Sequence, residues 1–160
     1  MAAPFYKLQN FDCRTSLGYL LRRTSNLMTQ RAEALFGDQD LTFTHWITLM
    51  ALRDGIADTA ADIARHHGYD PGATTRLIDQ LQERGLVERT RSKEDRRVVH
   101  LALTEEGRAV ASALQPRAVN NLNDVLSSFS HEDATKMVEL LTRLLARLEA
   151  DAAEKAQAAE

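Results

Sequence analysis

Apolar side chains recur at helical spacing along most of the chain. The first set runs from Leu17 to about Phe36 and predicts one helix, which residues 37–40 interrupt. A second set follows Thr42, whose hydroxyl can cap a helix start, and Gly55 closes this second predicted helix. The first third of the chain is therefore predicted to hold two helices, preceded by a short loose arm.

Two shorter helices separated by a tight turn are predicted next. Thr59, followed three residues later by an aspartate, starts a helix that runs to His67 and that Gly68 is placed to end. Asp70 can cap the following helix, and the proline after it costs no hydrogen bond at a first helical position. This fourth helix is predicted over residues 71–84.

The fourth predicted helix has an inward and an outward face. Four apolar residues are predicted to be buried by their spacing: Ala73, Leu77, Ile78 and Leu81. The outward face then holds Gly72, Thr75, Arg76 and Asp79, and Thr74 is expected to turn partly inward. Short side chains at the leading end of this helix allow its backbone to approach a partner closely.

Alternating branched residues predict a two-stranded hairpin after the fourth helix. The strands are expected over residues 86–90 and 98–103, joined by a polar tip at 91–97. Positive charge concentrates here, because residues 84–97 include six basic and three acidic side chains. The whole chain has a net charge of −3, so it would not coat nucleic acid by charge alone.

The last part of the chain is predicted to be helical. A long stretch from Thr104 to about Ser128 contains Pro116, which favours a kink or break. Ser130 can cap a final helix, whose apolar stripe comprises Met137, Leu140, Leu141, Leu144, Leu145 and Leu148. The tail from Ala150 is rich in alanine, glutamate and lysine, and we expect it to fray.

Composition indicates one globular domain per chain. The 160 residues are 44% hydrophobic and 27% charged, which is too apolar for a chain that is disordered throughout. The single cysteine, Cys13, excludes an intramolecular disulfide and fits a reducing compartment. No apolar run approaches the roughly 20 residues that span a bilayer, and no signal peptide is recognised. We therefore expect a cytoplasmic protein with no membrane partner.

No sequence feature predicts an enzyme, a cofactor or a metal site. We find no glycine-rich phosphate loop and no local nucleophile–base signature. His66 and His67 are adjacent, so on a helix they point in different directions and do not form the i, i+4 pair that shares one metal. His45, His100 and His131 are scattered along the chain. We expect no catalytic residues and no cofactor.

A helix, a tight turn, a second helix and a hairpin with a basic tip form the plan of a winged helix-turn-helix. A major groove about 12 Å wide admits one helix, and arginines on a hairpin tip suit the adjacent minor groove. Asp95 can orient one of those arginines before DNA arrives. The predicted DNA-contacting residues are Gly72, Ala73, Thr74, Thr75 and Arg76 on the helix, and Arg91, Lys93, Asp95, Arg96 and Arg97 on the tip.

Several stretches of the sequence resemble the MarR-type (multiple antibiotic resistance) family of transcription regulators. The likeness in layout covers about Leu17 to Leu148. It rests on the order and spacing of the matching stretches taken together. The matching stretches are Leu41–Trp46, Ala61–Ala64, Asp70–Leu77, Arg84–Arg89, Asp95–Arg97 and Leu101–Gly107.

The resemblance implies a mainly α fold with a small β-hairpin wing and a homodimeric repressor function. In the family, the first and last helices of two chains interlock, and two winged lobes bind a pseudo-palindromic operator in duplex DNA. An aspartate and the arginine two positions later mark the wing, which maps onto Asp95 and Arg97, with Arg96 a near competitor. On this plan, the chain divides into an arm and first dimerisation helix (1–36), a winged lobe (37–104), dimerisation helices (105–150) and a frayed tail (151–160).

The resemblance also implies an effector. Many members of the family release DNA when a small anionic aromatic compound or an oxidant acts. Their effector pocket lies between the dimer helices and the DNA-binding lobe. Here the candidate lining residues are Tyr19, Arg23, His45, Trp46 and Met50, of which the last two fit a core equally well.

Two other functions remain open at this point. A winged helix can serve protein assembly without DNA, although the predicted face of the fourth helix is small, polar and basic. One branch of the family senses organic hydroperoxides through a cysteine, but Cys13 lies about five residues too early, and Asp12 and Arg14 give no net push towards thiolate. Asp95 and Arg97 could also form an ordinary solvated ion pair.

Overall fold

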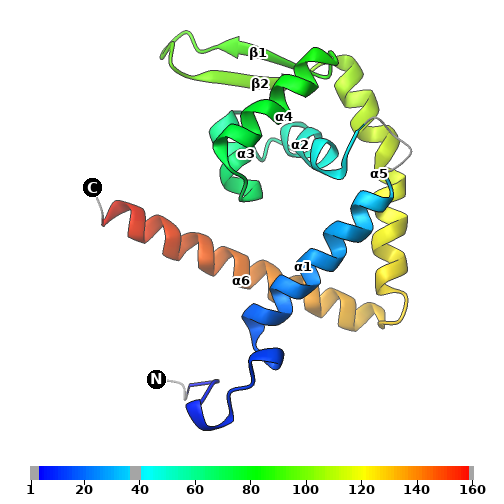
Figure 1. The fold of residues 1–160 in the computed structure, drawn as a ribbon, viewed down its shortest axis with the longest axis vertical. Helices are drawn as coiled ribbons and strands as arrows, with labels where there is room; N and C mark the ends of the chain where they lie inside the picture. Colours follow the sequence, from blue (N-terminus) through cyan, green and yellow to red (C-terminus); the bar gives the residue numbers. More distant parts are fainter. Residues whose placement is uncertain (1–3, 37–40, 159–160) are drawn as a thin grey trace. The chain divides into compact units, whose positions relative to one another are not determined.

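The computed structural model describes residues 4–36 and 41–158. Two short 3-10 turns, η1 (Leu8–Asn10) and η2 (Cys13–Thr15), precede six α-helices in these ranges, with a two-stranded hairpin between the fourth and fifth (Figure 1). The elements are α1 (Leu17–Ala34), α2 (Phe43–Arg53), α3 (Ala60–His67), α4 (Pro71–Glu83), β1 (Val87–Arg91), β2 (Val99–Leu103), α5 (Glu105–Leu126) and α6 (His131–Gln157). The predicted fold class, mainly α with a small hairpin, is confirmed.

The chain divides into two compact units, residues 1–118 and 119–160. The first contains α1 to α4, the hairpin and the beginning of α5, and the second contains the rest of α5 and α6. The predicted break between the first two helices, at residues 37–40, lies outside the described residues.

The core of the first unit forms from α2, α3, α4, the hairpin and α5. Trp46 of α2 belongs to this core, and its indole N–H donates a hydrogen bond of 3.1 Å to the carbonyl oxygen of Ala111 in α5. This bond satisfies the polar end of a buried indole and ties the two helices together. The largest fully buried apolar side chains come from α2, α3 and α4 and are Leu49, Ile63, Ile78 and Leu81.

The helix starts carry the side-chain caps that the sequence predicts. The hydroxyls of Thr42, Thr59 and Ser130 each accept a hydrogen bond from the backbone N–H three residues later, and Asp70 does the same for α4. Gly68 ends α3 with φ of 66°, in the left-handed region that favours glycine. These caps explain why the predicted starts of α2, α3, α4 and α6 are confirmed.

The last two helices are continuous where the sequence allowed a break or fraying. Pro116 was predicted to cause a kink or a break, and the break is absent because α5 runs from Glu105 to Leu126 as one helix, while the kink stays a prediction. A proline removes a single N–H donor, and more than two helical turns flank it on each side. The final helix continues to Gln157, beyond the predicted start of fraying at Ala150, because alanine, glutamate and lysine are strong helix formers.

The hairpin is attached to the rest of the lobe along one edge. Val87 of β1 pairs with Leu103 of β2 in antiparallel register, and Arg91 pairs with Val99. On the other side of β2, the N–H of Leu101 donates a hydrogen bond of 2.7 Å to the carbonyl oxygen of Asp58, which precedes α3. The base of the wing is therefore fixed by both strand pairing and this extra hydrogen bond.

The second unit has little core of its own. None of the described residues of α6 is buried. An amphipathic helix usually gains most of its stability by packing its apolar face. The exposed apolar side chains of α6 are Met137, Val138, Leu140, Leu141, Leu145 and Leu148.

Gly107, in the first turn of α5, is predicted not to tolerate a side chain. A Cβ atom there would overlap the backbone carbonyl of Leu86. Gly107→Ala should lower the free energy of unfolding by about 1–3 kcal/mol, because a backbone segment must move. Gly18→Ala in α1 is the control: its Cβ would meet nothing within 4 Å. Equal changes in urea or thermal unfolding for the two variants would contradict the close contact.

Candidate nucleic-acid interface

The turn between α3 and α4 fixes where α4 begins. After Gly68, the N–H of Tyr69 donates 3.0 Å to the carbonyl oxygen of Ala64, which closes the end of α3. Asp70 then caps α4, because its Oδ1 accepts a hydrogen bond of 3.0 Å from the N–H of Ala73. The two helices are therefore joined by a short, hydrogen-bonded turn of the helix-turn-helix type.

The leading end of α4 presents a short exposed face, made by Gly72, Ala73, Thr75 and Arg76. The hydroxyl of Thr75 donates 3.0 Å to the carbonyl oxygen of Pro71, so it lies along the helix. A Cβ at position 72 would lie 3.1 Å from Asp70 Oδ1 and 3.9 Å from Arg76 Nη1. A side chain at position 72 would therefore crowd the carboxylate of the cap and meet the arginine at an ordinary contact distance, whereas glycine leaves the backbone open.

Thr74 corrects the predicted division of α4 into two faces. Its side chain is only 1% exposed, and its hydroxyl donates 3.1 Å to the carbonyl oxygen of Asp70. Ala73, predicted to be buried, is exposed instead. Thr74 shares the inward face with Leu77 and Ile78 at intervals of three and four residues. As placed, its side chain packs in the core and does not reach the outer surface.

The wing tip is organised around Ser92 and Asp95. The N–H of Ser92 donates a hydrogen bond of 2.9 Å to the carbonyl oxygen of Val98. The N–H of Val98 in turn donates a hydrogen bond of 2.9 Å to the carbonyl oxygen of Asp95. The carboxylate of Asp95 accepts hydrogen bonds from Nε and Nη2 of Arg97, at 3.2 and 3.1 Å. The Arg97 side chain is nevertheless 91% exposed. Asp95 therefore orients Arg97, and not Arg96, without removing it from solvent.

Hydrogen bonds from Arg97 also stabilise the ionised form of the Asp95 carboxyl group. The guanidinium and the backbone N–H of Arg97 together lower the pKa of Asp95. Asp95 is therefore ionised near neutral pH and can hold the arginine in place.

Four further cations of the interface are exposed: Arg76, Arg91, Lys93 and Arg96. Among the residues that the structure describes, none of the four has an ion-pair partner. Their charges are available to an anionic ligand such as a phosphate backbone.

One ion pair joins the wing to α4 and was not foreseen from the sequence. Arg89 of β1 donates from Nη2 to Oδ1 of Asp79 in α4 at 2.6 Å. The sequence shows that both residues are charged, and it predicts Asp79 on the outward face of α4. It does not show that they pair, because the pairing depends on how the strand crosses the helix. The pair holds the base of the wing against the helix that carries Arg76.

Other charges of the helix-turn-helix lie on α3. Asp62 forms an ion pair with Arg65, and the hydroxyl of Thr59 lowers the pKa of Asp62. At the end of α3, burial lowers the pKa of His67, and the neighbouring His66 lowers it further. His67 is therefore predominantly neutral at neutral pH.

The five candidate effector-binding residues have different surroundings in the structure, and their role in binding an effector stays a prediction. Tyr19 and Arg23 are exposed on α1, and Met50 packs against the core. Trp46 is a core residue through its hydrogen bond to α5. His45 lines a pocket of about 370 Å³ between α2 and α4, together with Thr42, Thr44, Tyr69, Ala73, Arg76, Leu77 and Gln80.

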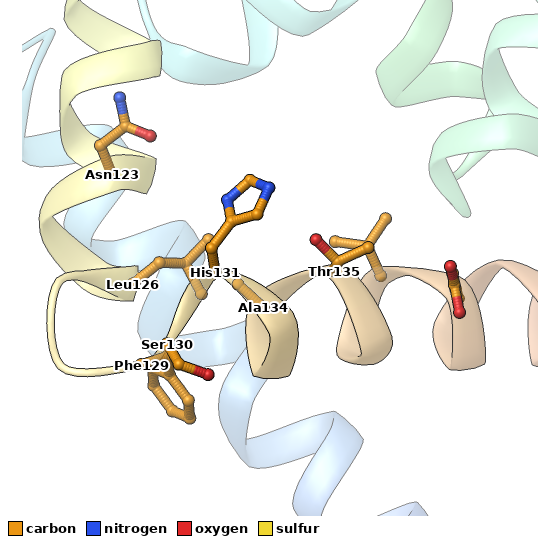
Figure 2. A pocket seen from close by; sticks show the side chains of 9 residues that line it. Asn123, Leu126, Phe129, Ser130, His131, Ala134 and Thr135 are labelled. Carbon is orange, nitrogen blue, oxygen red and sulfur yellow. The ribbon is translucent and has the colours of Figure 1, made fainter.

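Two other hollows are present. One of about 450 Å³ lies between α3 and α4 and is lined in part by Arg65, Tyr69 and Thr75. The other, of about 540 Å³, lies in the second unit at the turn between α5 and α6, where Leu126 and Phe129 contribute apolar surface (Figure 2). Figure 2 shows no acid, base and nucleophile arranged together among the residues it labels there.

Within the described ranges, no group of three or more histidine, cysteine, aspartate or glutamate side chains could hold a metal ion. Cys13 is exposed in η2. None of the helices in those ranges is both long and apolar enough to cross a bilayer.

Comparison with known proteins agrees with this geometry. Residues 39–98, which include α2, α3, α4 and most of the wing, match the sequence model of the MarR family. Solved structures extend the likeness to between 81% and 88% of the chain. The transcriptional regulator BldR from Sulfolobus solfataricus superposes with a TM-score of 0.76 at 23% identity, over 88% of this chain and 99% of that chain.

Two further structures are similar. BpsR of Bordetella bronchiseptica, whose DNA binding is regulated by 6-hydroxynicotinic acid, has a TM-score of 0.72 at 25% identity, over 84% of this chain and 96% of its own. MepR of S. aureus, solved in complex with DNA, has a TM-score of 0.67 at 26% identity, over 82% of this chain and 98% of its own.

The pKa of Asp95 is predicted to rise towards its ordinary value in Arg97→Ala, because the guanidinium hydrogen bonds are lost while the backbone one remains. A lowered pKa means that the Asp95–Arg97 pair is complete above the ordinary carboxyl pKa and is lost as pH falls through the lowered value. Carboxyl ¹³C shifts followed against pH will measure this. Arg96→Ala is the matched control and should leave the titration unchanged. The same midpoint in the wild type and Arg97→Ala would refute the pairing.

Proposed function

We propose that the chain is a MarR-type winged helix-turn-helix transcription regulator, a cytoplasmic homodimer that binds a pseudo-palindromic operator. The leading end of α4 enters the major groove, and Arg97 of the wing enters the adjacent minor groove. The dimer represses transcription until a small effector releases it. The observation that carries this proposal is the exposed face of α4 together with the oriented Arg97, held in one lobe by the Arg89–Asp79 pair.

In this proposal, the exposed residues of α4 have different roles in DNA recognition. Gly72 and Ala73 let the backbone approach the groove, while Thr75 and Arg76 are exposed and can reach base edges or phosphates. Thr74 is left out of the proposed contacts, since its side chain is buried.

The wing supplies charge and a minor-groove probe. Arg97 is oriented by Asp95 and remains exposed, which suits insertion into a groove of negative potential. Arg91, Lys93 and Arg96 are exposed without ion-pair partners among the described residues and would contact phosphates. A module for protein assembly alone would need an apolar face on α4, and the exposed residues there are small, polar or basic.

Dimerisation accounts for the exposed apolar surface of the helices outside the winged lobe. The stripe on α6 has no partner within the second unit, and α1 exposes Leu17, Leu20 and Leu27. Each leucine side chain removed from water contributes about 1.5–3 kcal/mol when fully buried. We propose that these faces pack against a second copy, which would place two winged lobes about one helical turn of DNA apart.

For the effector, we propose a small anionic aromatic compound. Support comes from BpsR, whose DNA binding responds to 6-hydroxynicotinic acid. A thermal-shift screen of aromatic acids and phenols, followed by operator release, tests this part. A screen in which no compound releases the operator would contradict the proposed effector class.

Replacing Arg97 and Arg76 by alanine should have different effects on DNA binding. Arg97→Ala is expected to weaken binding to many sequences and to lower the salt slope by about one counterion. Arg76→Ala should weaken binding to the preferred site by about ten- to a hundredfold and change which bases are preferred. Binding to the chain's own upstream region and to randomised DNA, measured over a salt series, separates the two effects.

Arg143→Ala on the polar side of α6 is the matched control for removing one arginine, and its binding should equal that of the wild type. Unchanged operator binding in both Arg97→Ala and Arg76→Ala, across the salt series, would show that the interface lies elsewhere. Absence of any sequence preference in the wild type would remove the proposed function.

Leu141→Glu is predicted to convert the dimer to monomers, because it places a charge in the exposed apolar stripe of α6. Sedimentation equilibrium should show the change, and operator affinity should fall with it. Arg143→Glu, two residues along on the polar face, is the control and should stay dimeric. A dimer of undiminished stability in Leu141→Glu would mean that α6 does not form the interface.

A further inference from the structure

His45 joins the start of α2 to α4. It is the third residue of α2, and only 9% of it is exposed. Its Nδ1 lies 3.1 Å from the backbone nitrogen of Thr42 and 2.8 Å from the Thr42 hydroxyl. Its Nε2 lies 2.9 Å from Oε1 of Gln80 in α4. One imidazole ring therefore bridges a helix cap and the helix that carries Arg76.

These contacts define which ring nitrogen holds the proton. A backbone N–H can only donate, so the Thr42 N–H requires an unprotonated Nδ1. The single proton of the neutral ring then lies on Nε2 and is donated to the carbonyl oxygen of Gln80. Both hydrogen bonds are made together only by this neutral form of His45.

A second proton would disrupt the cap. In the imidazolium, both ring nitrogens are donors, and Nδ1–H would oppose the N–H of Thr42. Two charged groups lie on the elements around the ring. Arg76 of α4 lines the same pocket, and Glu33 of α1 accepts hydrogen bonds from Phe43 and Thr44 of α2. Tyr69 of the turn also lines that pocket. Among the described residues, no acidic side chain pairs with the ring.

The hydrogen bond to Gln80 spans a place where α2 and α4 are not closely packed. The pocket of about 370 Å³ beside it is lined by residues of both helices and of the turn. Ala73 and Arg76, which belong to the proposed DNA-contacting face, border the same pocket. A change at His45 can therefore reach the exposed end of α4 through one side-chain contact.

We propose that His45 is a positioning residue for α4 and that its protonation weakens operator binding. The inference rests on the proposed DNA-binding function and adds a pH dependence to it. The capping box usually has glutamate or glutamine at the third helical position. Histidine makes the same cap, but its charge changes within the range of pH 5 to 8. Of these three residue types, only histidine has an ordinary pKa within that range.

His45→Gln is the matched variant. A glutamine can accept the Thr42 N–H through its carbonyl and donate its amide to Gln80, so both bonds are retained without a titrating group. His45→Ala removes both bonds. We would measure operator and scrambled-DNA affinity for the full-length proteins by fluorescence anisotropy, at fixed salt, from about pH 7.5 to about pH 5.5.

The quantity that tests the proposal is the operator affinity of the wild type divided by that of His45→Gln. This ratio should be near one at the higher pH and should fall about fivefold at the lower pH, the usual effect of losing one helix cap. His45→Ala should bind more weakly than His45→Gln at both pH values. A ratio that does not change with pH would overturn the proposal.

Imidazole ¹⁵N spectra of the wild type provide a second test that needs neither DNA nor a variant. The proposal requires the Nε2–H form of His45 at about pH 7.5, and a proton on Nδ1 would overturn it. A wild type that does not distinguish operator from scrambled DNA at either pH would instead refute the proposed function. Specific binding with an unchanged ratio would leave the proposed function standing and remove only the role of His45.

Discussion

The rotation of α4 about its own axis is the constraint on which the rest of the winged lobe depends. Thr74, Leu77, Ile78 and Leu81 face the core at intervals of three and four residues, and all four are buried. Burying Thr74 costs little free energy because its hydroxyl donates a hydrogen bond to the backbone carbonyl oxygen of Asp70. A turn of the helix by one residue, about 100°, would bury Thr75 and expose Leu77. The packing of one face therefore determines which side chains meet the solvent on the other.

The acidic residues of the lobe act mainly by orientation. Asp79 holds Arg89 against α4, and Asp95 holds Arg97 at the tip of the wing. Exposed ion pairs contribute at most about 1 kcal/mol each, so neither pair explains the stability of the fold. Their effect is to reduce the number of directions that each arginine samples. A chain with a net charge of −3 can thus present a locally positive surface whose arginines are already placed.

Local chemistry made much of the fold predictable. Hydroxyl and carboxylate caps, the glycine after α3 and the alternation of the strands are encoded within a few residues, and the structure confirms them. The error at Ala73 came from choosing the apolar residue over the spacing, since Thr74 fits the stripe of Leu77 and Leu81 better. The Arg89–Asp79 pair and the bond from Trp46 to Ala111 join distant segments, so they could not be predicted before the packing of the elements was known.

The same limit applies with more force to α6. Twenty-seven residues form a helix with no buried position, although its sequence has a strong apolar stripe. Helices gain most of their stability from packing, so a stripe that finds no partner within its own unit implies that association completes the fold. In the proposed dimer, folding and assembly would be coupled, and the stability of the chain would depend on its concentration. Since α5 begins directly after β2 and ends in the second unit, the dimer contacts proposed for α6 would be connected through one helix to the proposed DNA-binding lobe.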